Sequence, residues 1–237
     1  MAHAYIGTVD CEQVMGELRG MAEPSNLPGQ ARFGIDISSS LGISMTRLRP
    51  LARRIGKDHE LALALWSSRV REARILVSLV DDPKQVTMQQ MDSWAAEFTS
   101  WEVVDACCCN LFDRTEHRYV KAQEWAGAEP EFVKRAGFSL IAGIAVHDHK
   151  AADEQFQALL ALIQRESCDR RNFVRKAVNW ALRQIGKRNP ALNQAAITTA
   201  EQIAGMDCPG AGWVASDALK ELRSPQVQQR LSLKDKG

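Results

Sequence analysis

Trp101 and Asp105 are the pair of residues in this chain whose types and spacing most clearly suggest chemistry. They lie four positions apart in the stretch TSWEVVDACCCNLF. If this stretch is helical, the two side chains lie on one face, one turn apart. A carboxylate attracts a cationic centre, and the face of an indole ring shelters it. The pair therefore predicts a site for a positively charged substrate.

Two later segments could add to this site. EFVKRAGFSLIAG contributes Arg135, and RNFVRKAVNWALRQIGKRN contributes Trp180. Each residue also has a simpler interpretation, because a helical tryptophan is usually part of the core and a charged residue usually faces solvent. The combination of the four favours a site for a cationic group carried on a polyanion. The other tryptophans are predicted to pack in the core: Trp66, Trp94, Trp125 and Trp213.

The elements that must position these residues are predicted to be helices. Strand-like alternation is nearly absent, and apolar residues recur at steps of three or four. Asp58, Thr87 and Asp169 are placed to open helices as N-caps. Typical helix lengths give roughly twelve helices in an all-α chain. The periodic apolar positions are Leu48, Leu51, Ala52 and Ile55; Leu61, Leu65 and Trp66; Phe138, Ile141, Ala142 and Ala145; Phe156, Leu159, Leu160 and Ile163.

Helix–turn–helix segments over 130–167 and 170–204 suggest a repeat of about 35–40 residues. Short connections make consecutive helices antiparallel. This pattern favours an α-helical repeat solenoid, with a compact helical bundle as the alternative. The concave face of a solenoid is an extended binding surface, which we expect here to be basic. We predict one domain over residues 1–237, with N-terminal helices and a loop in 1–40, the repeat body in 41–223 and a tail in 224–237.

Basic residues are clustered, although the net charge is only +1. Residues 44–57 hold five basic residues and no acid, and residues 165–188 hold eight against two acids. Such clusters are typical of contact with a phosphate backbone, and solvated helix faces are the alternative. The predicted nucleic-acid contacts are Arg47, Arg49, Arg53, Arg54, Arg171, Arg175, Lys176, Arg183, Lys187 and Arg188.

The six cysteines and the apolar runs bear on location. Cys107, Cys108 and Cys109 are adjacent and make poor disulfide partners, and no CxxC pair suggests structural zinc. His147 and His149 are two apart, which suits a helix-end loop better than a metal site. No apolar run reaches the roughly 18 residues of a membrane span, and the N-terminus lacks a secretory pattern. We expect reduced cysteines, a cytoplasmic location, and no metal or cofactor.

The segments SWEVVD (100–105), FVKRAGFSLIA (132–142) and FVRKAVNWALRQIGK (173–187) resemble the AlkD-type DNA glycosylases, the helical-repeat family of DNA alkylation repair enzymes. The resemblance extends over about residues 41–223 and implies a HEAT-like repeat fold. In that family a tryptophan and an aspartate one turn apart, an arginine on a following helix and a second tryptophan form the site. The matching residues here are Trp101, Asp105, Arg135 and Trp180. Glu102 departs from the pattern that often follows the motif tryptophan.

The resemblance implies a monofunctional N-glycosylase that excises 3-methyladenine and 7-methylguanine from duplex DNA. Alkylation makes these bases cationic, so they leave as neutral molecules without a general acid. Asp105 would stabilise the cationic sugar and orient a water, Trp101 and Trp180 would line the deoxyribose, and Arg135 would hold a phosphate. The family's mode of recognition implies excision without base flipping. An abasic product without strand cleavage is expected because no Schiff-base lysine is predicted. The protein is expected to act as a monomer.

Two alternatives to the enzyme remain open. One is a non-catalytic helical-repeat module that binds a DNA structure or a protein partner, since related helical-repeat proteins are thought to bind DNA without excising bases. The other is a protein-binding scaffold, which would show no salt-dependent affinity for DNA. A Schiff-base lysine is not expected, because Lys134 and Lys176 neighbour motif residues and point about 100° away from them on a helix.

Overall fold

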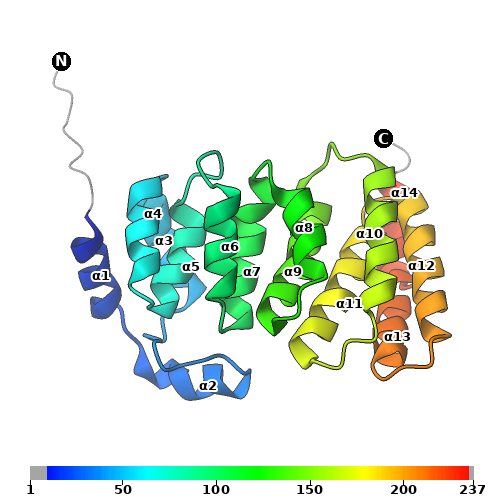
Figure 1. Ribbon diagram of the computed structural model, residues 1–237, viewed down its shortest axis with the longest axis horizontal. Helices are drawn as coiled ribbons and strands as arrows, with labels where there is room; N and C mark the ends of the chain where they lie inside the picture. Colours follow the sequence, from blue (N-terminus) through cyan, green and yellow to red (C-terminus); the bar gives the residue numbers. More distant parts are fainter. Residues whose placement is uncertain (1–9, 235–237) are drawn as a thin grey trace. The chain divides into compact units, whose positions relative to one another are not determined.

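The structure is a computed structural model that describes residues 10–234, and helices make up its regular secondary structure (Figure 1). No β-strand occurs within this range, which confirms the all-α prediction. The chain divides into two compact units, of which the first ends at Val86 and the second begins at Thr87. The single domain over 1–237 remains a prediction. None of the described helices is long and apolar enough to cross a membrane.

The first unit is built around three packed helices. Leu48 and Leu51 of α3, Leu61 and Leu65 of α4 and their neighbours are buried at the predicted spacing. Asp58 caps α4 by accepting a hydrogen bond from the Leu61 amide at 2.9 Å, as predicted. The elements of this unit are α1 (Cys11–Gly20), the 3₁₀ turn η1 (Pro24–Asn26), α2 (Leu27–Arg32), α3 (Met45–Ile55), α4 (His59–Ser67) and α5 (Arg71–Val80).

The second unit is a series of helix pairs. The second helices of successive pairs, α7, α9, α11 and α13, pack against one another in that order, and α8 packs on α9 and α12 on α13. The elements are α6 (Met88–Ala96), α7 (Trp101–Asn110), η2 (Phe112–Arg114), α8 (Arg118–Ala126), α9 (Glu131–His147), α10 (Asp153–Glu166), α11 (Asn172–Gly186), α12 (Pro190–Ala204), α13 (Ala211–Leu222) and α14 (Pro225–Lys234).

Two details of the helix prediction differ from the structure. The described residues contain fourteen α-helices, more than the twelve expected, and α14 lies in the predicted tail. Thr87 caps α6, as predicted. Asp169 does not cap a helix, because its carboxylate accepts from the amide and guanidinium of Arg171, and α11 begins only at Asn172.

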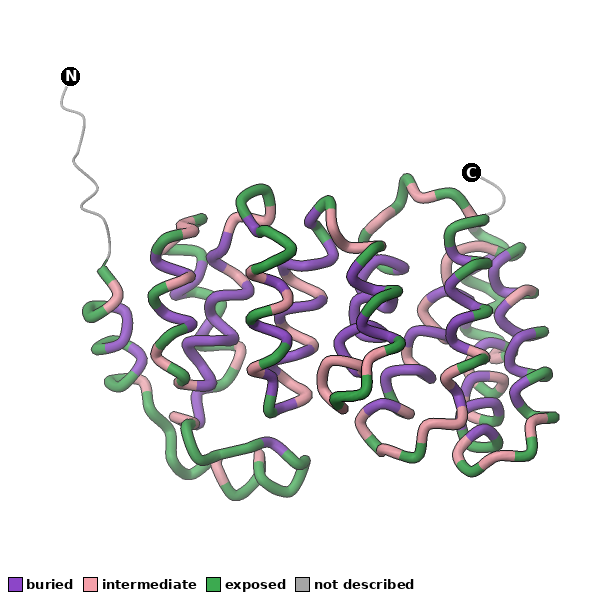
Figure 2. The backbone as a smooth tube through the Cα atoms, viewed as in Figure 1, coloured by how far each residue is buried: buried purple, intermediate pink, exposed green. Residues whose placement is uncertain are grey.

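Most helices carry buried residues, whereas α2 has none (Figure 2). In the second unit Phe112 lies between Trp94 and Trp125, with ring centroids 6.1 and 5.9 Å away. Trp66, Trp94 and Trp125 are buried, which confirms their predicted packing role. The same prediction is wrong for Trp213, which is 40% exposed in the first turn of α13.

A close helix contact sets the position of α9, which carries two residues of the candidate site. A Cβ added at Gly137 would lie 2.3 Å from the backbone nitrogen of Ala126 at the end of α8. Such a distance is shorter than any real carbon–nitrogen contact, so only glycine allows this approach. The register of α9 against α8 is thereby fixed at a residue that lies two positions from both Arg135 and Ser139.

A disulfide joins Cys168 to Cys208, with their Cα atoms 5.6 Å apart. The expectation of fully reduced cysteines is therefore wrong for this pair. Their 40-residue separation hid the pairing, because it arises only when the α10–α11 and α12–α13 loops meet. Cys11, Cys107, Cys108 and Cys109 are free thiols, and burial raises the pKa of Cys108 and of Cys109 well above the ordinary value. Those two thiols are poor nucleophiles.

Candidate functional site

The centre of the candidate site is the carboxylate of Asp105, one turn into α7. Arg135 of α9 donates to both of its oxygens, from Nε to Oδ1 at 3.1 Å and from Nη2 to Oδ2 at 2.7 Å. The hydroxyl of Ser139, one turn further along α9, donates to Oδ1 at 2.7 Å. The side chain of Asp105 keeps 22% of its surface exposed. The carboxylate is therefore held in a fixed orientation while one side stays open to solvent.

Arg135 is largely buried, with 7% of its side chain exposed. Its Nη1 donates to the carbonyl oxygen of Phe173, at the start of α11, at 2.7 Å. Three nitrogens of Arg135 thus donate hydrogen bonds, two to Asp105 and one to the backbone of α11. The sequence leads us to expect a phosphate contact from this residue. In the structure its first partner is Asp105, and the phosphate contact stays a prediction for its remaining donors.

Trp101 joins the same group from the first residue of α7. The guanidinium carbon of Arg135 lies over its ring, 5.7 Å from the centroid. The ring is half-buried beside the carboxylate of Asp105 one turn later. The predicted pairing of an indole ring and a carboxylate on one helix face is therefore present in the geometry.

Trp180 lies on α11, two turns after Phe173 and on nearly the same helix face, and it is half-buried. Seven residues correspond to about 10 Å along a helix. The structure therefore brings Arg135 into contact with both Trp101 and Asp105, and it places Trp180 on α11, which packs against α9. The role predicted for Trp180 in lining the sugar stays a prediction.

Beside Arg135, an ion-pair network joins α9 to the loop before α11. Lys134 contacts Glu166 at 2.6 Å and Asp169 at 3.4 Å. Burial would raise the pKa of Asp169, but hydrogen bonds from Arg171 outweigh it and lower that pKa to about 2. Burial would also raise the pKa of Glu166, but hydrogen bonds from Lys134 and Arg165 outweigh burial and lower that pKa. Lys134 is thus an ion-paired cation.

Acid is expected to weaken this network through Asp169. Because its folded-state pKa is lowered, Asp169 stabilises the fold above its ordinary pKa of 3.8, and this contribution is lost as the pH falls towards 2. Urea unfolding measured above pH 3.8 and near pH 2 should show a smaller acid-induced loss for Asp169→Asn than for the native protein. Asp207→Asn, which changes an exposed acid, serves as the control. Equal losses in the native protein and Asp169→Asn would contradict this role.

Much of the predicted basic cluster in the second unit is neutralised inside the fold. Arg183 and Lys187 both contact Glu221 of α13, the latter at 2.6 Å. Arg171 pairs with Asp169. Lys176 is exposed on α11, and Arg175 lies over the ring of Trp213. Of the predicted DNA contacts in this unit, Arg175 and Lys176 have the best access to an anion.

The other predicted contacts lie in the first unit, on α3. Arg47, Arg49, Arg53 and Arg54 are all exposed. Arg54 forms an ion pair with Glu17, and Arg47 donates to the carbonyl oxygen of Met21 at 3.0 Å. The first unit therefore presents an exposed basic helix, as its sequence predicts. The prediction that the basic residues line one concave face is left as a prediction.

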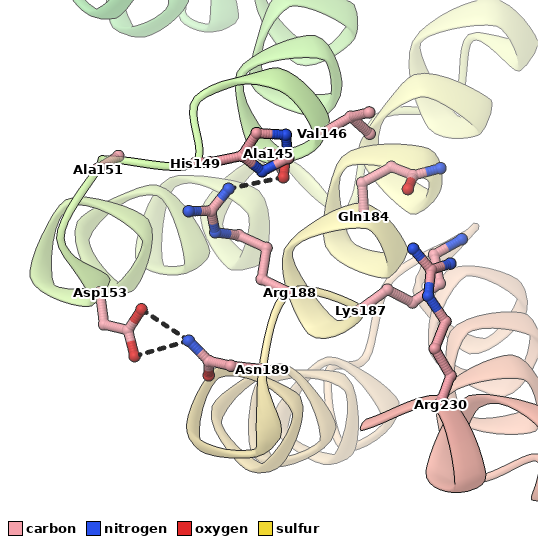
Figure 3. A pocket seen from close by; sticks show the side chains of 10 residues that line it. All are labelled: Ala145, Val146, His149, Ala151, Asp153, Gln184, Lys187, Arg188, Asn189 and Arg230. Carbon is pink, nitrogen blue, oxygen red and sulfur yellow. Dashed lines mark hydrogen bonds between the residues drawn. The ribbon is translucent and has the colours of Figure 1, made fainter. Parts of the chain in front are cut away.

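A cavity of about 380 Å³ in the second unit lies at the other end of α9 and α11 from Asp105 (Figure 3). It is lined mainly by polar side chains that have partners within the fold. Arg188 donates to the carbonyls of Ala145 and Asp148, and Asn189 donates to Asp153. Arg188 also lies 4.0 Å over the ring of Phe156. These contacts indicate a structural role for Arg188, which sequence clustering assigned to DNA.

The comparison with known families decides the identity of the chain. The family model described as DNA alkylation repair enzyme matches residues 14–222. The chain belongs to this family. The predicted membership of the helical-repeat family of DNA alkylation repair enzymes is thereby confirmed. An uncharacterized protein of Listeria innocua is 23% identical over 196 residues, which cover 81% of this chain and 85% of that protein. A Listeria monocytogenes protein, also uncharacterized, is 21% identical over the same shares.

A solved structure supports the fold of this DNA alkylation repair family member. It comes from a new family of proteins related to the HEAT-like repeat DNA glycosylases, with affinity for branched DNA structures. It matches with a TM-score of 0.78 and covers 94% of this chain and 96% of its own, at 18% identity. The predicted HEAT-like helical repeat is therefore confirmed.

Sequence reasoning missed two parts of the site in this family member. Ser139 follows Arg135 by four residues, so the i, i+4 rule could have placed both on the Asp105 side of α9. The Phe173 carbonyl that receives Arg135 leaves no trace in the sequence, because every residue has such a group. Both missed groups hold the pair of Arg135 and Asp105 in place.

Proposed function

We propose that this protein is a monofunctional DNA N-glycosylase that excises positively charged alkylated purines, such as 3-methyladenine and 7-methylguanine, from duplex DNA. The observation that carries the proposal is the carboxylate of Asp105, fixed by Arg135 and Ser139 beside the ring of Trp101 and still partly exposed. Membership of the DNA alkylation repair enzyme family supports DNA repair as the setting.

The hydrogen bonds leave Asp105 with capacity for one more partner. A carboxylate offers about four lone-pair positions, of which Nε of Arg135 and the Ser139 hydroxyl use two on Oδ1, and Nη2 of Arg135 uses one on Oδ2. The remaining position on Oδ2 can accept from a water. As the base departs, the sugar becomes cationic, and the same oxygen would stabilise it and direct that water to it.

Each neighbour of Asp105 has a distinct part in this scheme. The alkylated base leaves as a neutral molecule, so the site needs a carboxylate and no general acid. Trp101 and Trp180 would shelter the cationic sugar with their ring faces. Arg135 acts as a positioning residue that holds the carboxylate, and its spare donors would face a phosphate. Recognition without base flipping and action as a monomer belong to the same proposal.

A second candidate function is binding to a DNA structure without excision. The bidentate contact from Arg135 favours it, because a paired carboxylate stabilises a nearby cation less than a lone one does. The similar solved structure belongs to proteins with affinity for branched DNA structures. In this function the same residues would form a groove that binds the DNA backbone.

Release of free base from methylated duplex DNA tests the proposal. We expect the native protein to release 7-methylguanine or 3-methyladenine and to leave an abasic site, because only the N-glycosidic bond is cleaved and the phosphodiester bonds of the strand stay intact. The released base is measured by chromatography, and the strand is checked for cleavage without alkali.

Two results would contradict a monofunctional glycosylase. Absence of released base together with salt-sensitive binding to duplex or branched DNA would establish the second candidate. A covalent adduct trapped by borohydride would instead show a Schiff-base lysine. We do not expect Lys134 to form one, because it is ion-paired with Glu166 and Asp169.

A further inference from the structure

Trp213 is an exposed aromatic residue that the proposed site does not use. It lies in the first turn of α13, with 40% of its surface exposed, although most of the other tryptophans are buried. The guanidinium carbon of Arg175 lies over its ring, 5.0 Å from the centroid. An arginine stacked on an exposed indole is a flat, cationic surface.

The guanidinium of Arg175 is not fully hydrogen-bonded. Its Nε is buried, and no acceptor for it lies in the part of the chain that the structure describes. A buried donor without an acceptor costs free energy. Because Nε itself has no access to solvent, an anionic oxygen of a ligand would bind the other guanidinium nitrogens of Arg175. Its neighbour Lys176 is exposed on the same turn. Two acids oppose an anion at this place: the exposed Asp207 in the α12–α13 loop, and Asp217, which lies one turn after Trp213 on α13 and 3.7 Å from Arg183.

Three features hold this surface rigid. Gly210 has φ +99°, and a Cβ there would lie 3.2 Å from Cδ of Arg175, so the loop lies directly against the stem of the arginine. The Cys168–Cys208 disulfide joins the same loop to the one before α11. Asn179 of α11 donates to the carbonyl of Val214, next to Trp213, at 3.0 Å. The ring and the guanidinium are therefore set before any ligand arrives, which lowers the entropic cost of binding.

The surface is close to the candidate site along the chain. Phe173, whose carbonyl receives Arg135, precedes Arg175 by two residues in the first turn of α11. A DNA strand that passes Asp105 could thus continue to Trp213 across the amino-terminal ends of α11 and α13, which carry partial positive charge. No deep pocket is needed, because a base stacks on a flat ring.

We propose that Trp213 and Arg175 form a subsite for an unpaired nucleobase and its phosphate, where single-stranded DNA leaves a duplex. The ring of Trp213 stacks on the base, and Arg175 donates to the phosphate. Stacking on an aromatic side chain accepts any of the four bases. This inference rests on the proposed function in requiring DNA binding, and it is independent of base release.

The test compares affinity for a blunt DNA duplex and for the same duplex with a short single-stranded thymidine tail. We expect the native protein to prefer the tailed duplex by about 5- to 100-fold, the range for stacking one base on an aromatic residue. Trp213→Leu keeps an apolar side chain and removes the aromatic ring, so it should abolish this preference and leave blunt-duplex affinity unchanged. Trp213→Phe should keep most of the preference.

Two substitutions of Arg175 test whether the charge of its side chain contributes to the preference for the tail. Arg175→Lys keeps the charge and Arg175→Met keeps the length, and we expect the preference for the tail to fall more in the second. Melting temperatures close to that of the native protein show that each variant is folded. A tail should also quench the tryptophan fluorescence of the native protein more than that of Trp213→Phe.

Three outcomes would overturn the subsite. The first is a native protein without preference for the tail, and the second is a Trp213→Leu protein that retains the full preference. The third is an equal loss of affinity for both DNAs, which would give Trp213 a general structural role. A native protein that binds neither DNA would overturn the proposed function as well. Binding to the blunt duplex without preference for the tail separates failure of the subsite from failure of the proposed function.

Discussion

Replacing Asp105 with asparagine is expected to reduce base release from methylated duplex DNA by about 100-fold or more, because a positioned acid–base group contributes 10²–10⁴-fold to catalysis. The amide keeps nearly the shape of the carboxylate and can still accept from Ser139, but it lacks the negative charge that stabilises the sugar cation. Affinity for DNA should change little. Single-turnover base release and duplex affinity, measured on the same protein, separate the two effects.

The controls must distinguish chemistry from loss of structure. Asp105→Asn leaves the buried guanidinium of Arg135 with a weaker partner, so the melting temperature of the variant is needed beside its activity. Glu102→Gln removes the same charge one position after Trp101 on α7, and its base release should stay near that of the native protein. Equal loss of affinity and activity in Asp105→Asn would exclude the catalytic role and favour a backbone-binding groove.

Removing the disulfide should have the largest effect on stability. The double replacement Cys168→Ser and Cys208→Ser is expected to lower the free energy of unfolding by about 2–4 kcal/mol, because the bond closes a 40-residue loop of the unfolded chain. Urea unfolding of the native and doubly substituted proteins measures the difference. Reduction of the native protein should give the same loss.

A matched control for this experiment is Cys11→Ser, which changes a free cysteine of the first unit. Its stability should match that of the native protein, with or without a reductant. If the double replacement is as stable as the native protein, the two loops are held together by their other contacts, such as the packing of Gly210 against Arg175.

Features that depend on neighbours in sequence could be predicted. Apolar spacing marked the buried faces of α3, α4, α9 and α10, and Leu48, Phe138 and Phe156 are fully buried as expected. The pair of Trp101 and Asp105 could be read as one helix face because four residues make about one turn. The Asp58 and Thr87 caps followed from local side-chain chemistry.

Features that depend on distant residues could not be predicted. Arg183 and Lys187 looked like free cations in their own segment, and Glu221, more than 30 residues away, neutralises them. Arg135 looked like a surface residue until α7 and α11 surrounded it with Asp105 and the Phe173 carbonyl. Trp213 looked like a core residue, because nothing in its local sequence shows that α13 places it outside. Pairing of Cys168 with Cys208 required the same knowledge of which loops meet.

The candidate site is assembled from the second helices of three successive pairs. α7 supplies the carboxylate, α9 the groups that orient it, and α11 the carbonyl that accepts from Arg135. No single repeat contains a working unit. A repeat inserted between α7 and α11 would separate these groups, whereas a repeat added beyond α13 would leave them together. The chain can therefore lengthen at its carboxyl-terminal end without losing this constellation, and its chemistry can be inherited only as a block of consecutive repeats.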